Sequence, residues 1–135
     1  MRKEEIIRTV LTYYPSIQGI YVFGSYGSGD PLPDSDVDIA LLLPHEQAKE
    51  EKNLMLSQCR FDLEKVLKKQ VDLLNARQVS TVFQKEIIFG DLIFCSNANA
   101  VDEFEMLTLS YYQKLNEERS GILDAFMRTA RAYEV

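Results

Sequence analysis

The stretch GSYGSGDPLPDSDVD, residues 24–38, lies between two apolar segments and decides how the chain is interpreted. A Gly-Ser pair opens it, and two aspartates with one residue between them close it. Glycine, proline, serine and aspartate are typical of an ordinary turn between strands. The same residue types also bind highly charged ligands, so the neighbouring segments must distinguish the two interpretations.

The segments on both sides of this stretch are predicted to be strands. IQGIYVFG, residues 17–24, is β-branched and aromatic and is bounded by Pro15 and Gly24. DVDIALLL, residues 36–43, is polar at its start and apolar to its end. A continuous apolar run of this kind predicts a strand that is covered on both faces.

The remaining elements follow from apolar periodicity and from capping residues. Ser80 is a candidate N-cap and Gly90 a stop for one helix, and Pro15 ends another. In chain order we predict a helix over 4–14, the two strands, one helix over 45–69, a strand over 70–76, a helix over 80–90, a strand over 91–96 and a long helix from about residue 99.

This order of elements predicts an α+β fold: a small mixed sheet packed with helices, with a long C-terminal helix. No internal repeat and no linker long enough to separate domains interrupts the pattern. We therefore expect residues 1–135 to form a single domain.

Composition excludes several classes of protein. The net charge of −6 and the absence of a basic cluster larger than LKKQ, residues 67–70, argue against direct nucleic-acid binding. The apolar stretches are too short to span a bilayer, and the first residues do not form a secretory signal, so we expect a cytoplasmic protein. Cys59 and Cys95 each lie in an apolar setting, where we expect them to pack as small hydrophobic residues.

Asp36 and Asp38 are separated by one residue, so on a strand their carboxylates point to the same face. Two adjacent carboxylates repel each other, and a hard divalent cation such as Mg²⁺ is the simplest compensation. Taken alone, the pair fits solvated caps of a turn at least as well as a metal site.

Asp72 adds a third carboxylate. In QVDLLN it alternates with Val71 and Leu73, which places it on the face of a later strand. If that strand lies beside DVDIALLL, the three acids meet at one sheet edge, as phosphoryl and nucleotidyl transfer sites with metal ions require. Asp72 could also accept the proton of an attacking hydroxyl, or it could simply be a surface aspartate at a strand start.

Gly24 and Ser25 are candidate phosphate-binding residues. Backbone N–H groups at a glycine-rich turn bind anions, and Ser25 adds a hydroxyl donor. No lysine follows the glycines, so the loop is not of the Walker A type. A glycine-rich loop by itself is weak support for nucleotide binding.

The joint spacing is more specific. FGS, ten residues and then DVD, all between two strands, resembles the G-S-x10-D-x-D signature of the polymerase-β-like nucleotidyltransferase superfamily. The length of the chain resembles that of the minimal nucleotidyltransferases (MNT). The resemblance implies that Gly24 and Ser25 bind the nucleotide, and that Asp36, Asp38 and Asp72 are catalytic and hold Mg²⁺.

The downstream segments STVFQKEIIFGDLIF and YYQKLNEER are similar to those of MntA-type antitoxins from HEPN–MNT toxin–antitoxin pairs. That resemblance implies ATP as the substrate and transfer of AMP onto a tyrosine of a partner HEPN ribonuclease, which silences it. Many relatives carry an arginine in the loop after Gly-Ser, whereas this chain has GSYGSG. A distant basic residue such as Arg77 is a candidate replacement.

Two other interpretations stay open at this point. The chain could neutralise a toxin by binding alone, using an aromatic stripe on the last helix (Phe104, Tyr111, Tyr112 and Phe126). We nevertheless expect most of that stripe to be intramolecular core. Transfer of a nucleotide to a small-molecule hydroxyl would use the same site, but it usually requires a larger substrate-binding domain.

Overall fold

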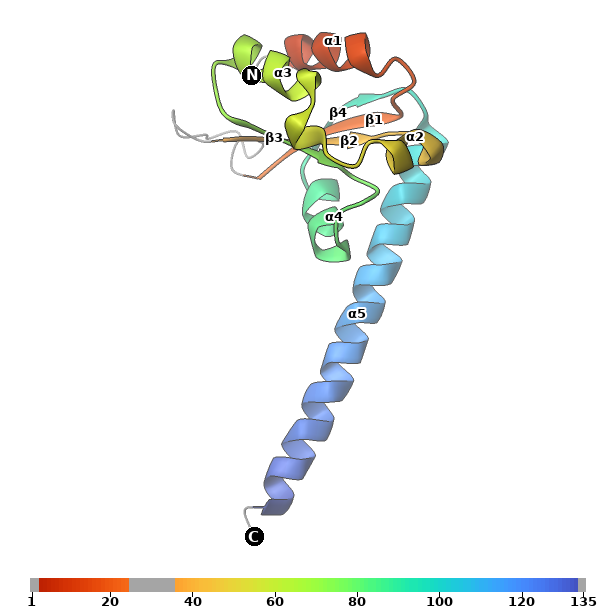
Figure 1. Cartoon of the computed structure of the whole chain (residues 1–135). Coiled ribbons are helices and arrows are strands. Elements are labelled where there is room, and N and C mark those ends of the chain that lie inside the picture. The colour runs from red at the N-terminus through yellow and green to blue at the C-terminus, as the bar shows by residue number, and fades with distance from the viewer. Residues whose placement is uncertain (1–2, 25–35, 134–135) are drawn as a thin grey trace.

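A four-stranded mixed sheet with helices on both faces forms the body of the protein, and one long helix projects from it (Figure 1). This computed structural model describes residues 3–24 and 36–133, with the side chains of the last helix described continuously as far as Ile122. In chain order the elements are α1 (Lys3–Tyr13), β1 (Gly19–Phe23), β2 (Val37–Leu42), α2 (His45–Glu50), the 3-10 turn η2 (Leu54–Leu56), α3 (Gln58–Leu67), β3 (Val71–Asn75), α4 (Thr81–Ile88), β4 (Asp91–Cys95) and α5 (Ala98–Tyr133).

The strand order in the sheet is β3-β2-β1-β4. β1 pairs antiparallel with both β2 and β4, whereas β2 and β3 pair in parallel, with Asp38 opposite Asp72. The parallel pair requires a crossover, and α2, η2 and α3 supply it. The α+β fold with a mixed sheet and a long C-terminal helix is confirmed.

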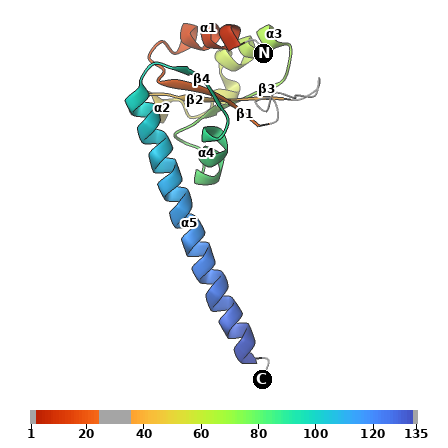
Figure 2. The ribbon, with the colours of Figure 1, turned by 180° about the vertical axis from the view of Figure 1, so that it is seen from behind.

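Two separate cores cover the two faces of the sheet. On one face, α1 and α3 pack over side chains such as Val22, Ile39 and Leu73 (Figures 1 and 2). On the other face, α4 and the first turns of α5 pack over Tyr21 and Leu42. β2 is buried on both faces, as its continuous apolar sequence predicts.

The capping signals act where the sequence predicts them. The side chain of Ser80 accepts a hydrogen bond from the backbone N–H of Phe83 and begins α4. Gly90 follows the last turn, and a β-carbon on it would lie 2.6 Å from Cβ of Phe23. Glycine therefore allows the end of α4 to approach β1 closely.

The single helix predicted over 45–69 is wrong. The segment divides into α2, η2 and α3, with residues 51–53 outside any helix. The buried side-chain amide of Asn75 donates to the backbone oxygens of Ala48 at 2.9 Å and of Glu51 at 3.1 Å. These contacts satisfy carbonyl groups at the end of α2 that a longer helix would otherwise use, and Ser57 begins α3 as an N-cap.

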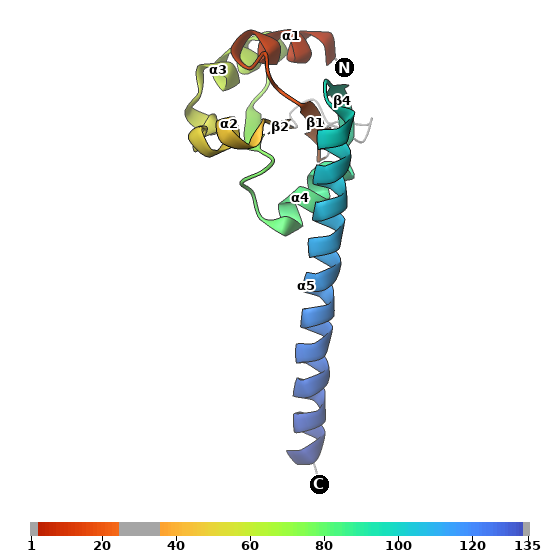
Figure 3. The ribbon, with the colours of Figure 1, turned by 90° about the vertical axis from the view of Figure 1, so that its right-hand side faces the viewer.

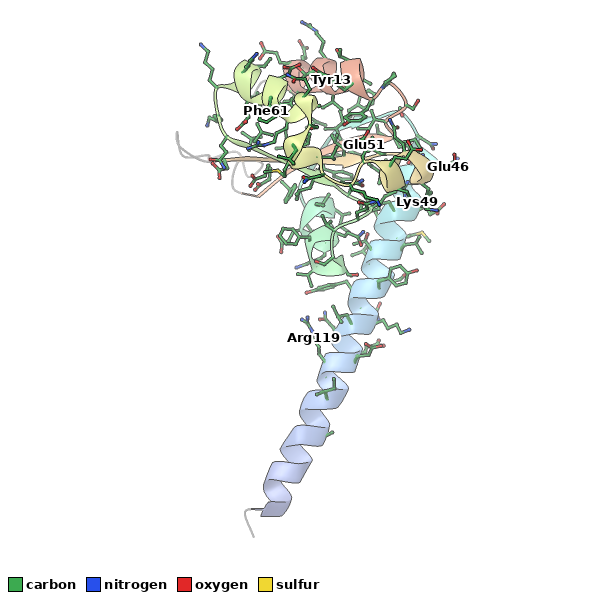
Figure 4. The ribbon with its side chains drawn as sticks, viewed as in Figure 1. Tyr13, Glu46, Lys49, Glu51, Phe61 and Arg119 are labelled. Atoms are coloured by element: carbon green, nitrogen blue, oxygen red, sulfur yellow. The ribbon has the colours of Figure 1, made fainter. Side chains whose placement is uncertain are left out.

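The expectation that most of the stripe on the last helix is intramolecular core holds for Phe104 and not for Tyr111. Phe104 is buried and Tyr112 is half-buried, but Tyr111 is 56% exposed, because α5 extends beyond α4 and leaves the body of the protein (Figure 3). The side chain of Phe126 lies outside the described residues. Arg119 lies on this projecting part (Figure 4). Burial ends where α5 passes the end of α4.

Cys59 is buried as expected, whereas Cys95 is exposed at the end of the edge strand β4, so the packing predicted for Cys95 is wrong. An edge strand has a neighbour on one side only, and the burial of β4 is correspondingly low. None of the helices within 3–24 and 36–133 combines the length and hydrophobicity needed to cross a membrane.

Candidate active site

Asp38 and Asp72 lie side by side on neighbouring parallel strands. The register pairs Val37 with Val71 and Asp38 with Asp72, near the start of both strands. Side chains alternate along a strand, so the two aspartates share the face that carries Leu42, on the side of the sheet covered by α4. Strand pairing therefore brings together two carboxylates that are 34 positions apart by their sequence numbers.

The surroundings of Asp38 change the ionisation of this one carboxyl group. Partial burial raises the pKa of Asp38 to about 6, and the charge of Asp72, a hydrogen bond with the Asp72 side chain and the charge of Asp36 add to the effect. Two ionised carboxylates at this point would repel each other, so the pair favours an additional positive charge.

Gly24 adjoins the same carboxylate. Its backbone has a φ of +74°, a conformation that L-residues with side chains rarely adopt. A β-carbon on Gly24 would collide with Oδ2 of Asp38. The two ends of the G-S-x10-D-x-D signature therefore meet in space, because the antiparallel register places Phe23 opposite Asp38.

The other two candidate residues, Asp36 and Ser25, are not placed at this contact. Asp36 is exposed and immediately precedes β2, and its charge makes the smallest of the four contributions to the pKa of Asp38. Ser25 lies outside the described residues. Among the residues that the structure describes, no three acidic, histidine or cysteine side chains converge closely enough to hold a metal ion.

Arg77 does not lie at this site. Its Nε donates to the backbone oxygen of Leu43 at 2.6 Å and one of its terminal nitrogens donates to Oε1 of Gln18 at 2.6 Å. Leu43 follows the far end of β2, whereas Asp38 is near the start of that strand. These two hydrogen bonds commit the guanidinium group of Arg77 to the fold, away from the carboxylate pair, and partial burial lowers the pKa of Arg77.

Arg60 and Glu64 were not selected from the sequence, although both contact the strand that carries Asp72. Their i,i+4 spacing on a helix directly before QVDLLN is the only sequence signal, and such pairs occur on many helices. Their contact with β3 depends on the angle at which α3 crosses the sheet, which a sequence pattern does not contain.

The sheet, with the carboxylate pair on two parallel strands and a glycine turn against it, defines a nucleotidyltransferase fold and site. The family described as polymerase beta, nucleotidyltransferase, matches residues 4–99, which include every residue of the site. The chain belongs to this family.

The nearer relatives belong to toxin–antitoxin pairs. The chain is 30% identical to the protein adenylyltransferase MntA of Shewanella oneidensis over 132 residues, which cover 98% of this chain and 92% of that protein. A solved toxin–antitoxin structure with AMP-PNP is similar with a TM-score of 0.72 at 30% identity, covering 94% of this chain and 99% of the matched one. The structure of a tri-AMPylated Shewanella oneidensis HEPN toxin in complex with an MNT antitoxin gives a TM-score of 0.65 at 28% identity, covering 93% and 95% of the two chains.

Proposed function

We propose that this protein is an antitoxin that transfers AMP from ATP to a tyrosine hydroxyl of a partner HEPN ribonuclease toxin and thereby inactivates the toxin. The observation that carries the proposal is the contact of Gly24 with an Asp38–Asp72 pair, in a chain similar along 98% of its length to a protein adenylyltransferase. The similar toxin–antitoxin structures, one with AMP-PNP and one with a tri-AMPylated toxin, support both the nucleotide and the partner. We place the reaction in the cytoplasm.

In the proposed reaction, the acceptor oxygen attacks the α-phosphorus of ATP and a new P–O bond forms. The bond between the α-phosphorus and the bridging oxygen to the β-phosphate breaks, and pyrophosphate leaves with the bonding electrons. Asp72 orients the acceptor hydroxyl and accepts its proton. Catalysis of this kind needs no nucleophilic side chain of the enzyme, because positioning and charge neutralisation lower the barrier.

The donor set fits Mg²⁺. Carboxylate oxygens are the ligands that this ion prefers, and Asp38 is a partly buried carboxyl whose pKa is raised by that burial and then by the charge of Asp72. Asp38 and Asp72, which lie together, would hold the ion with phosphate oxygens of the substrate, and Asp36 is proposed to join them when the ion is bound. When bound, Mg²⁺ would neutralise charge on the triphosphate.

Gly24 and Ser25 are proposed to bind the phosphates. Gly24 has a positive φ and lies directly beside Asp38, so the described part of the chain after β1 ends at the carboxylate pair. Backbone N–H groups at glycine-rich turns bind anions. Because Arg77 is bound elsewhere, backbone amides and the proposed ion carry the role that a loop arginine has in other relatives.

Mass spectrometry of the partner toxin tests the proposal. After incubation with this protein, ATP and Mg²⁺, we expect the toxin to gain mass in AMP units and to lose ribonuclease activity. Asn variants of Asp36, Asp38 and Asp72 should fold and fail to transfer. Transfer of labelled AMP at the wild-type rate by both Asp36→Asn and Asp38→Asn would show that the site is assigned wrongly.

Neutralisation by binding alone is the second candidate function. It is favoured by exposed apolar side chains just after α4 and on α5, which include Phe89, Met106 and Ile122. A triple Asn variant of Asp36, Asp38 and Asp72 separates the two functions. It should still inhibit the toxin if binding suffices, and it should not if AMP transfer is required.

A further inference from the structure

The strand that carries Asp72 is held from outside the sheet by side chains of the preceding helix. β3 is an edge strand, with β2 on one side only. The outward backbone oxygen of Val71 accepts a hydrogen bond from Nε of Arg60 at 2.8 Å, and the N–H of Val71 donates to Oε2 of Glu64 at 3.2 Å. On the other side of Asp72, the N–H of Leu73 donates to Sδ of Met55 at 3.3 Å.

These side chains are themselves fixed. A second nitrogen of Arg60 donates to the backbone oxygen of Met55 at 3.1 Å, and its third lies 3.6 Å from Oε2 of Glu64. The Arg60 and Glu64 side chains are only 16% and 27% exposed, so solvent screens this pair less than it screens an ordinary surface ion pair. Arg60 therefore joins η2, α3 and the start of β3 through one guanidinium group.

We propose that Arg60 and Glu64 are positioning residues for the reaction, because they hold Val71 in the register that places Asp72 opposite Asp38. The inference rests on the proposed AMP transfer. Val71 directly precedes Asp72, and both of its outward backbone groups bind this pair. With the pair removed, both outward backbone groups of Val71 lose their partners, and we expect Asp72 to move more relative to Asp38.

A purely structural role makes a different prediction. Covering the outward groups of an edge strand also prevents pairing with other chains and adds stability. In that case the loss of Arg60 or Glu64 would reduce the amount of folded protein without changing the turnover of the molecules that remain folded. Kinetic constants per folded molecule therefore distinguish the two roles.

The test compares Arg60→Met and Glu64→Ala with the conservative variant Glu64→Gln, whose amide oxygen still accepts from Val71. With the HEPN toxin as acceptor, we expect kcat per folded molecule to fall roughly tenfold to a hundredfold in the first two variants. We expect KM for ATP to change little, because Gly24 and the loop after it are untouched. Glu64→Gln should keep most of the activity.

Asn75→Ala is the matched control, since Asn75 lies at the opposite end of β3 and holds α2 through Ala48 and Glu51. This variant should be destabilised while its kcat per folded molecule stays near that of the wild type. Equal kcat in Glu64→Ala and the wild type, or an equal loss in Asn75→Ala, would overturn the proposal.

Hydrogen–deuterium exchange gives a readout that does not depend on activity. The amides of Val71 and Asp72 should exchange severalfold faster in Glu64→Ala than in Glu64→Gln, while the amides of β1 stay protected. Unchanged exchange at Val71 would refute the positioning role even if activity fell. If the wild type did not transfer AMP, the proposed function would fail, whereas the exchange measurement would still decide whether the pair holds β3.

Discussion

A side chain on Gly24 would collide with the carboxylate of Asp38. The φ of Gly24 is +74°, and the atom that a β-carbon would meet is Oδ2 of Asp38. Backbone conformation and side-chain contact thus require glycine independently. The relationship joins the glycine of the proposed nucleotide loop to an aspartate of the proposed metal site.

Replacement of Gly24 by alanine should therefore damage both stability and transfer. We expect about 1–2 kcal/mol of destabilisation from the left-handed backbone alone. Displacement of Asp38 should lower AMP transfer by roughly tenfold or more. Urea unfolding and transfer assays measure the two effects separately.

Gly121→Ala is the control for that substitution. Gly121 lies within α5 and has no atom within 4 Å of the added β-carbon, so alanine should stabilise the helix by up to about 1 kcal/mol. Equal stability of Gly24→Ala and the wild type would contradict the requirement for glycine at Gly24.

At neutral pH, ionised Asp38 should lower the free energy of unfolding of the protein. Its pKa rises from 3.8 to about 6 on folding, so the folded state binds more protons between these values. The stability that this group contributes is complete below about pH 3.8 and is lost as the pH rises through about 6. In metal-free buffer at pH 7, the free energy of unfolding of Asp38→Asn should therefore exceed that of the wild type by roughly 1 kcal/mol, with solvent screening allowed for. The same variant should not transfer AMP.

The stability of the wild type relative to Asp62→Asn should change with pH in the opposite direction. Hydrogen bonds from Tyr13 and Gln58 lower the pKa of Asp62, so its contribution to stability is present above its unfolded pKa and is lost as the pH falls through the lower folded value. Unfolding midpoints measured from pH 3 to 7 on both variants check the two signs. If the wild type became more stable relative to Asp38→Asn as the pH rose from 4 to 6, the raised pKa of Asp38 would be excluded.

Arg77→Met should affect stability and leave nucleotide binding unchanged. The substitution removes two hydrogen bonds that tie the segment after β3 to Leu43 and Gln18, and we expect a loss of about 1–3 kcal/mol. KM for ATP should stay at the wild-type value because Arg77 lies at the far end of β2. A tenfold rise in KM for ATP would instead place its guanidinium group at the triphosphate.

Tyr21→Phe should loosen the attachment of α5 to the sheet. The hydroxyl of Tyr21 is fully buried and donates to Oε1 of Glu105 at 3.0 Å, and burial followed by that hydrogen bond raises the pKa of Tyr21. We expect a loss of about 1 kcal/mol in urea unfolding. Tyr111→Phe is the control, because Tyr111 is exposed on α5, and it should change stability by no more than about 0.5 kcal/mol. Equal losses of stability in the two variants would argue against the attachment of α5 through Tyr21.

Local sequence patterns determined most of the element order and much of the candidate site. Pro15, Ser80 and Gly90 act on their immediate neighbours, so their effects were predictable. The alternation in DVDIALLL and QVDLLN likewise placed Asp38 and Asp72 on strand faces before any strand was paired. The break after α2 was not predictable in this way, because it depends on the amide of Asn75, 24 to 27 residues away.

By itself, the sequence of this protein determined the spacing from Gly24 to Asp38 and the family to which that spacing points. Only the tertiary structure decided that Asp72 lies opposite Asp38, that Arg77 lies at the far end of β2 and that Tyr111 on α5 is exposed. The physical reason is that capping and alternation act within a few residues of the chain. Strand register and helix docking are set by contacts between segments that are distant in the sequence.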